Sequence, residues 1–238
     1  MTQDEAKRLV ARQAAELVED GMVVGLGTGT TATWFIRELA GRVQRGELKI
    51  RCVASSDASH ELAVSLGMDV ATLNELPELD VYVDGADEIC KAHGGLDLIK
   101  GGGGALLREK IVASAAKEFI CVVDSSKLVK MLGRFPLPVE VVKMALPLVE
   151  PKLAALGFTP KLRQKKDASG TFISDEGNYI LDCWSTGIAE PESTAAEIRS
   201  IIGVVEHGLF LGMATLALVA GDDGVAEYGV DSVEPATA

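Results

Sequence analysis

The 238-residue sequence predicts an α/β protein with a parallel sheet, followed by a smaller α+β unit. In the first half, short apolar segments of strand character alternate with segments whose apolar residues recur at helical spacing. Repeated βα units are typical of a parallel sheet with helices on both faces. Two prolines, Pro136 and Pro138, then mark a boundary after which the order of elements changes.

The first half opens with an expected helix over residues 3–19 and continues in regular alternation. Asp57 is the expected N-cap of one helix and Gly67 its stop. Ligands of parallel sheets bind at the carboxyl ends of the strands, so the loops there are the first candidates for function. The predicted elements are strand 22–27, helix 31–43, strand 49–55, helix 57–67, strand 79–85, helix 104–116 and strand 118–124.

The second half has the order βαββαβ, which is the ferredoxin-like arrangement. The segment "SDEGN" (174–178) has the composition of a hairpin loop, and the tail predicts strands joined at "GDDG" that return to the first unit. We therefore expect a Rossmann-like domain over residues 1–132 plus 207–238 and a ferredoxin-like domain over 133–206. The elements expected in the latter are strand 138–143, helix 147–156, strand 158–165, strand 178–183, helix 191–200 and strand 203–206.

Composition and charge narrow the class of protein. Hydrophobic residues make up 47% of the chain, which is enough for a sizeable core, and the net charge of -12 disfavours a nucleic-acid binder. The four cysteines form no CxxC pair and are expected to be buried thiols in a reducing compartment. No apolar run reaches the roughly 18 residues that span a bilayer, and the N-terminus does not resemble a signal peptide. We expect a soluble cytoplasmic protein.

The segment "GLGTGTTAT" (25–33) follows a strand and opens a helix. Glycines at a helix N-terminus expose backbone N–H groups to an anion, and the hydroxyls of Thr28, Thr30 and Thr31 add donors. The third glycine of a dinucleotide fingerprint is missing, as is the lysine of a Walker motif. The segment favours a phosphate-sized anion site over a tight turn with incidental threonines.

The segment "DVYVDGADEI" (80–89) places Asp84, Asp87 and Glu88 at the end of a strand. Clustered carboxylates suit a hard cation, but the spacing fits no EF-hand. His60, His93 and His207 are dispersed and form no ligand pair. A solvated acidic turn remains one interpretation; the other is a wall of polar groups for a hydroxylated substrate, with a carboxylate that moves protons.

The segment "KGGGGALLREK" (100–110) combines a lysine, four glycines and a helix. The glycines allow the backbone to approach a ligand closely, with the charge of Lys100 beside them. On a helical wheel Glu109 falls on the apolar face, whereas Arg108 and Lys110 fall to either side. An inward carboxylate has a raised pKa and suits a general base, although a buried ion pair with Lys100 or with a lysine from elsewhere in the chain is an equal alternative.

Two further lysines complete the inventory. Lys127 follows the strand that ends at Asp124, and Lys7 lies on the first helix; either is a solvated lysine or a contact to an anionic ligand. A phosphate cradle, cations, carboxylates and an inward glutamate at one sheet edge suit proton transfer on a phosphorylated polyol.

Taken together, these segments resemble those of a known family. The motifs "GLGTGTTAT", "SSDAS" (55–59), "VDGADEI" (83–89), "KGGGGALLREK" and "FPLPVEV" (135–141) come in the order and spacing of ribose-5-phosphate isomerase, type A. The resemblance covers essentially the whole chain. It implies interconversion of ribose 5-phosphate and ribulose 5-phosphate in the non-oxidative pentose phosphate pathway through a cis-enediolate, without metal or organic cofactor, in a homodimer or a dimer of dimers.

The resemblance also implies roles for matching positions. Glu109 matches the base, Asp84 and Asp87 match residues that bind sugar hydroxyls and assist ring opening, and Lys100 would stabilise the enediolate. The implied substrate-binding residues are Lys7, Thr28, Gly29, Thr30, Thr31, Gly85, Ala86, Gly101, Gly102, Gly103 and Lys127. Residues 90–98 form a longer loop than is usual in the family, and Gly104 stands where alanine is common.

Three other classes share parts of this pattern. A CoA-transferase-like enzyme would use the glutamate as a nucleophile and form a thioester adduct. A sugar-phosphate sensor would keep the cradle but needs a DNA-binding or partner module, for which no basic segment is present. A dinucleotide-dependent oxidoreductase is disfavoured by the missing fingerprint glycine.

Overall fold

The computed structural model describes residues 1–92 and 95–229, so His93 lies outside the described residues. Its largest sheet has seven strands in the order β14-β13-β7-β4-β1-β2-β3, all parallel except the pair β13–β14. The return of the chain tail to this sheet, expected from the sequence, is confirmed. The strands are β1 (Val23–Leu26), β2 (Arg51–Ala54), β3 (Val70–Ala71), β4 (Leu79–Asp84), β7 (Ala116–Asp124), β13 (Leu216–Gly221) and β14 (Gly224–Gly229).

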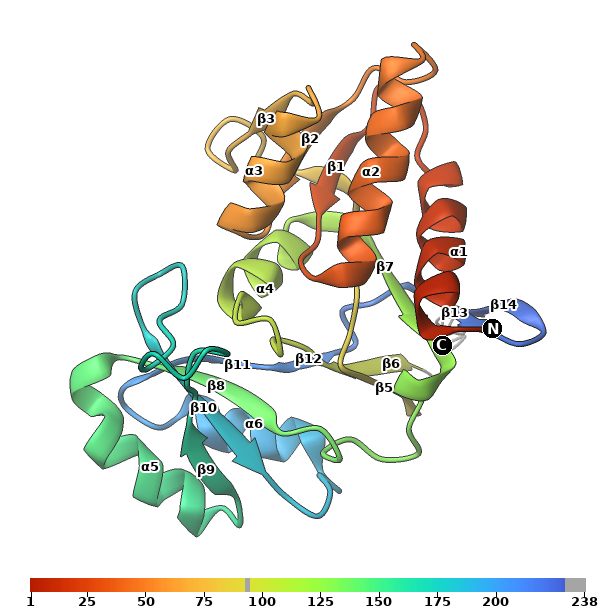
Figure 1. Ribbon diagram of the computed structural model, residues 1–238. Helices are drawn as coiled ribbons and strands as arrows, with labels where there is room; N and C mark the ends of the chain where they lie inside the picture. The colour runs from red at the N-terminus through yellow and green to blue at the C-terminus, as the bar shows by residue number, and fades with distance from the viewer. Residues whose placement is uncertain (93–94, 230–238) are drawn as a thin grey trace, which may run out of the picture.

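Helices cover both faces of this sheet, as predicted (Figure 1). On one face α1 (Gln3–Glu16) and α2 (Thr30–Gln44) pack their apolar sides onto the strands, with Val10 and Phe35 fully buried. On the other face α4 (Leu106–Ser114) buries Val112 against the sheet. A further helix, α3 (Asp57–Ser65), begins at Ser56, whose hydroxyl accepts from the N–H of Ser59, so the N-cap lies one residue before the expected Asp57.

The second sheet is antiparallel and has the order β11-β8-β10-β9, which together with two helices gives the ferredoxin-like arrangement. Its core is a separate cluster of buried residues around Val139, Val149 and Leu181. The expected division of the chain at residues 133 and 206 stays a prediction. The elements are β8 (Leu137–Val141), α5 (Leu146–Ala155), β9 (Thr159–Leu162), β10 (Tyr179–Trp184), α6 (Pro191–Arg199) and β11 (Val204–His207).

A third sheet was missed by the sequence analysis. β5 (Glu88–Ala92) and β6 (Gly95–Ile99) form a hairpin, and β12 (Leu209–Leu211) adds to β6 with Leu209 opposite Ile99. The interpretation of residues 90–98 as a loop is therefore wrong for the described residues of that segment. This small sheet buries Leu98 and Phe210 beneath the large one and lies between the two larger sheets (Figure 1).

The glycine run (residues 101–104) determines where α4 begins. Gly101 has φ +99° and Gly104 has φ +94°, which are left-handed conformations that other residues adopt only with strain. The helix therefore starts at Leu106 and not at the expected residue 104. Within the described residues, no helix is long and apolar enough to cross a membrane.

Candidate active site

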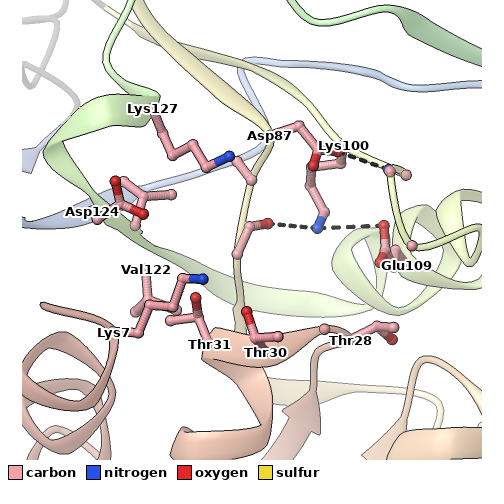
Figure 2. Close-up of a pocket in the computed structure, with 17 residues that line it drawn as sticks. Lys7, Thr28, Thr30, Thr31, Asp87, Lys100, Glu109, Val122, Asp124 and Lys127 are labelled. Carbon is pink, nitrogen blue, oxygen red and sulfur yellow. Dashed lines mark hydrogen bonds and ion pairs between the residues drawn. The ribbon is translucent and has the colours of Figure 1, made fainter. Parts of the chain in front are cut away.

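A cavity of about 140 Å³ opens at the carboxyl ends of β1, β4 and β7 (Figure 2). This is the edge at which parallel sheets bind ligands. The structure brings every predicted site residue except Asp84 to its wall. The lining residues are Lys7, Thr28, Gly29, Thr30, Thr31, Gly85, Ala86, Asp87, Lys100, Gly101, Gly102, Gly103, Glu109, Val122, Val123, Asp124 and Lys127.

The turn between β1 and α2 forms one wall. Gly29 is the N-cap of α2 with φ +94°, and Thr30 and Thr31 occupy the first turn of this 15-residue helix. The first N–H groups of a helix have no acceptor within it, so they are free for an anion. Figure 2 shows the amine of Lys7 and the hydroxyl of Thr31 in the same part of the cavity. The wall thus has the donors that a phosphate group requires.

At the opposite wall lies a cluster of three buried charged side chains, of which Lys100 and Glu109 line the cavity. Lys100 Nζ donates to Asp84 Oδ2 at 2.7 Å and to the carbonyl oxygen of Gly85 at 2.6 Å, and lies 3.4 Å from Glu109 Oε2. The side chains of Lys100, Asp84 and Glu109 are 3%, 0% and 4% exposed. Burial alone would lower the pKa of Lys100, but Asp84 and Glu109 raise it above its ordinary value, so the amine stays charged.

Asp84 is the predicted site residue that does not reach the cavity. Its Oδ1 accepts from the N–H groups of Thr28, at 2.9 Å, and Gly85, at 2.7 Å, while Oδ2 accepts from Lys100 and from the buried hydroxyl of Tyr82. With both oxygens engaged twice, this carboxylate holds Lys100 and the β1–α2 turn. Asp84 thus lies outside the cavity lining, and its expected contact with a sugar hydroxyl stays a prediction.

Glu109 faces inward, as the helical wheel predicted. Burial, opposed by the charge of Lys100 and increased by Asp84 and Asp87, raises the pKa of Glu109 to about 8. Its Oε2 forms no hydrogen bond among the described residues, because the approach of Lys100 is an ion pair without hydrogen-bond geometry. A buried carboxylate oxygen that accepts no hydrogen bond, has a raised pKa and lies beside a cavity is the pattern of a general base.

Asp87 lies across the cavity from the β1–α2 turn. Its Oδ2 accepts from the N–H of Gly102 at 2.7 Å, and burial raises its pKa although this hydrogen bond opposes the shift. The carboxyl group is thus suited to exchange a proton with a bound hydroxyl. Glu88, the third acid of the segment, points elsewhere: it accepts from the N–H groups of Gly133 and Phe135, at 2.7 and 2.6 Å.

The last part of the wall comes from β7 and the turn after it. Lys127 and Asp124 both line the cavity (Figure 2), and the Asp124 carboxylate accepts from the N–H of Ser126 at 3.1 Å and from Gln3 Nε2 at 3.3 Å. Sequence reasoning missed Asp124, Val122 and Val123 as lining residues. Their position at the end of a parallel strand was the available signal. No group of metal-ligating side chains is present in residues 1–92 and 95–229.

The fold and the cavity define a class of protein. It is an enzyme with a Rossmann-like sheet, and in its cavity a buried carboxylate, a lysine and a glycine run lie opposite a helix N-terminus that can bind a phosphate. The family model of ribose 5-phosphate isomerase A (phosphoriboisomerase A) matches residues 51–224. The chain belongs to this family.

Individual relatives agree over nearly the full length. A ribose-5-phosphate isomerase A of Roseiflexus castenholzii is 52% identical over 224 residues, covering 93% of this chain and 94% of the relative. The ribose 5-phosphate isomerase A structure from Methanocaldococcus jannaschii superposes with a TM-score of 0.91 at 41% identity, covering 96% of this chain and all of that one. A D-ribose-5-phosphate isomerase in complex with phospho-erythronic acid superposes with a TM-score of 0.92 at 36% identity, covering 96% of this chain and 100% of that one.

Proposed function

We propose that this protein interconverts D-ribose 5-phosphate and D-ribulose 5-phosphate through a cis-enediolate, with Glu109 as the base. The observation that carries the assignment of the base is the buried Oε2 of Glu109, which accepts no hydrogen bond and lies 3.4 Å from Lys100 Nζ at the cavity wall. Family membership supports the reaction. The cradle at the other end of the cavity supports a phosphorylated substrate.

In the proposed reaction Glu109 removes the proton from C2 of the open-chain aldose. The C–H electron pair becomes the C1–C2 double bond, and negative charge develops on O1. Lys100 and the amides of the glycine run stabilise this charge, so no metal or organic cofactor is required. The proton returns from Glu109 to C1, the hydroxyl proton of O2 passes to O1, and the ketose is formed.

The remaining residues anchor and open the sugar. Residues 28–31 and Lys7 hold the phosphate. Thr28 already donates its N–H to Asp84 and shares a hydroxyl hydrogen bond with Ser55 at 3.0 Å. The donors left free among the described residues are therefore those of Thr30 and Thr31 at the start of α2. Asp87, whose pKa is raised by burial, exchanges the proton of the ring hydroxyl during opening. Asp84 holds Lys100 in place, and Lys127 contacts the sugar or its phosphate. The phospho-erythronic acid in a related isomerase is a ligand of the size and charge that such a cavity would take.

Substitution of the base tests this proposal. Glu109→Gln keeps the size of the side chain but cannot accept a proton, so kcat should fall by about 10²- to 10⁴-fold, with little change in KM. Ribose 5-phosphate isomerisation is measured in a coupled assay with EDTA present, and Glu61→Gln, an exposed position on α3, is the matched control. A Glu109→Gln enzyme with the kcat of the wild type would exclude Glu109 as the base.

The assembly and location belong to the same proposal. A homodimer or a dimer of dimers in the cytoplasm, with a catalytic domain over residues 1–132 plus 207–238 and a small domain over 133–206, fits the family. Four buried free cysteines agree with a reducing compartment. Sedimentation equilibrium measures the assembly directly, and a monomer at micromolar concentration would contradict it.

A further inference from the structure

Arg163, the residue directly after β9 of the four-stranded sheet, contacts the glycine run. Arg163 Nη1 donates to the carbonyl oxygens of Gly101, at 2.9 Å, and Gly102, at 3.3 Å. Its Nε donates to Asp182 Oδ2 at 2.9 Å, and its Nη2 donates to Asp182 Oδ1. The planar guanidinium therefore bridges β10 and the run of residues that forms the cavity wall.

Arg163 is itself fixed by the strands around it. Its N–H donates to the carbonyl oxygen of Ile180 at 2.9 Å, and its carbonyl oxygen accepts from the N–H of Phe172 at 3.0 Å. The ring of Phe172 lies so close to Gly104 that an added Cβ there would be 2.4 Å from Cζ. A side chain on such a rigid support positions its partners accurately.

Peptide geometry connects this contact to the cavity. In a planar trans peptide the C=O and the following N–H point in opposite directions. In the peptide between Gly101 and Gly102, the C=O faces Arg163 and the N–H donates to Asp87 Oδ2 at 2.7 Å. In the next peptide the C=O of Gly102 also accepts from Arg163, whereas the N–H of Gly103 has no acceptor among the described residues. Gly103 lines the cavity, so its amide is a free donor there.

We propose that Arg163, held by Asp182, is a positioning residue that orients the Gly103 amide as a donor to the enediolate. The inference rests on the proposed function. A run of four glycines samples many conformations on its own, and each must be excluded before its amides can stabilise a transition state. Arg163 fixes two carbonyl oxygens of the run, and its charge polarises both peptides, which strengthens their N–H groups as donors.

The test removes the pair and measures the chemical step separately from phosphate anchoring. The double variant Arg163→Gln/Asp182→Asn leaves no unpaired charge, and Lys161→Gln, an exposed position on β9 two residues before Arg163, is the control. In the double variant kcat should fall about 10- to 100-fold. Affinity for phospho-erythronic acid, which carries a carboxylate in addition to its phosphate, should fall, whereas affinity for inorganic phosphate should not change.

The outcomes separate positioning from folding and from the proposed function. If the double variant has a lowered melting temperature, Arg163→Ala is assayed with added guanidinium ion, which should restore kcat in a folded protein. The positioning role would be overturned by any of three results: wild-type kcat in the double variant, an equal loss of affinity for phospho-erythronic acid and for phosphate, or no rescue of kcat by guanidinium. These three results would not affect the assignment of Glu109 as the base. A Glu109→Gln enzyme with wild-type activity, by contrast, would contradict the proposed function itself.

Discussion

Three carboxylates within five residues, Asp84, Asp87 and Glu88, have three different environments. Asp84 is fully buried and binds Lys100, Asp87 lines the cavity, and Glu88 accepts from two backbone N–H groups of residues 133–135. The sequence predicted an acidic strand end but could not separate these environments. The partners of Glu88 lie about 45 residues away along the chain, and no local pattern encodes such a contact.

The inward orientation of Glu109, by contrast, was predicted from helical periodicity alone. It shares a helix face with Leu106, Val112 and Ala113, which are all buried, and this face packs on the sheet. The sequence left open whether the carboxylate is a base or an ion-paired structural group. The structure shows why both have a physical basis: Lys100 lies 3.4 Å away, yet its hydrogen bonds go to Asp84 and Gly85.

The raised pKa of Glu109 predicts the pH dependence of activity. Asp84 and Asp87 face this carboxylate and raise its pKa, while Lys100 lowers it, and burial brings the value to about 8. If Glu109 is the base, as proposed, it must be ionised, so kcat/KM should decline as the pH falls below about 8. The kcat/KM values for ribose 5-phosphate, measured from acid to alkaline pH, check this. A profile that stays flat down to the ordinary pKa of a glutamate would contradict it.

The same shift predicts a stability effect of opposite sign. The folded protein binds the Glu109 proton more tightly than the unfolded chain does, since the pKa is raised from 4.5 to about 8. The stabilising contribution of this protonation is complete below 4.5 and is lost as pH rises through about 8. Urea unfolding across this range should show wild type losing stability relative to Glu109→Gln with rising pH. Parallel curves for the two proteins would show that the pKa is not raised.

At the scale of elements, close contact between β1 and β4 shapes the site. A Cβ on Gly27 would lie 2.4 Å from Asp84 Cγ and 2.5 Å from the carbonyl oxygen of Val83. Gly27→Ala must therefore displace the carboxylate that holds Lys100, and we expect a loss of about 1–3 kcal/mol in unfolding free energy together with lower kcat. Thermal melts and the coupled assay measure both. Gly229→Ala, where nothing lies within 4 Å, is the control; equal behaviour of the two variants would contradict this prediction.

The strands that sequence analysis missed are short or lack a clear apolar pattern. β3 has two residues and β12 has three, too few for a period to be recognised. The hairpin of β5 and β6 carries charged residues such as Lys91 and Asp97, and its third strand comes from Leu209–Leu211, which is more than a hundred residues away. Long, periodic segments such as α1, α2 and β7 were predicted correctly because local burial alone specifies them.

At the scale of the whole molecule, the cavity depends on contacts between the seven-stranded sheet with its helices and the four-stranded sheet with its loops. The connection between β9 and β10 extends toward α4 (Figure 1), and two arginines fasten it there. Arg163 binds the glycine run, and Arg108 of α4 binds Asp57 Oδ1 at 2.6 Å and Glu176 Oε1 at 2.5 Å. The helix that carries Glu109 is thus attached, through the neighbouring Arg108, to the loop before β10 of the four-stranded sheet.

Removal of the second arginine tests this attachment. Arg108→Gln loses ion pairs to Asp57, Asp175 and Glu176, which are partly exposed, so the cost in stability should be about 1 kcal/mol or less and should shrink with added salt. Hydrogen exchange in residues 174–178 should nevertheless accelerate, because this turn then loses its link to α4. Arg51→Gln, which breaks a single exposed pair with Asp69 elsewhere, should leave that exchange unchanged. Unaltered hydrogen exchange in Arg108→Gln would show that the contacts of Arg163 and Phe172 alone hold the four-stranded sheet against the site.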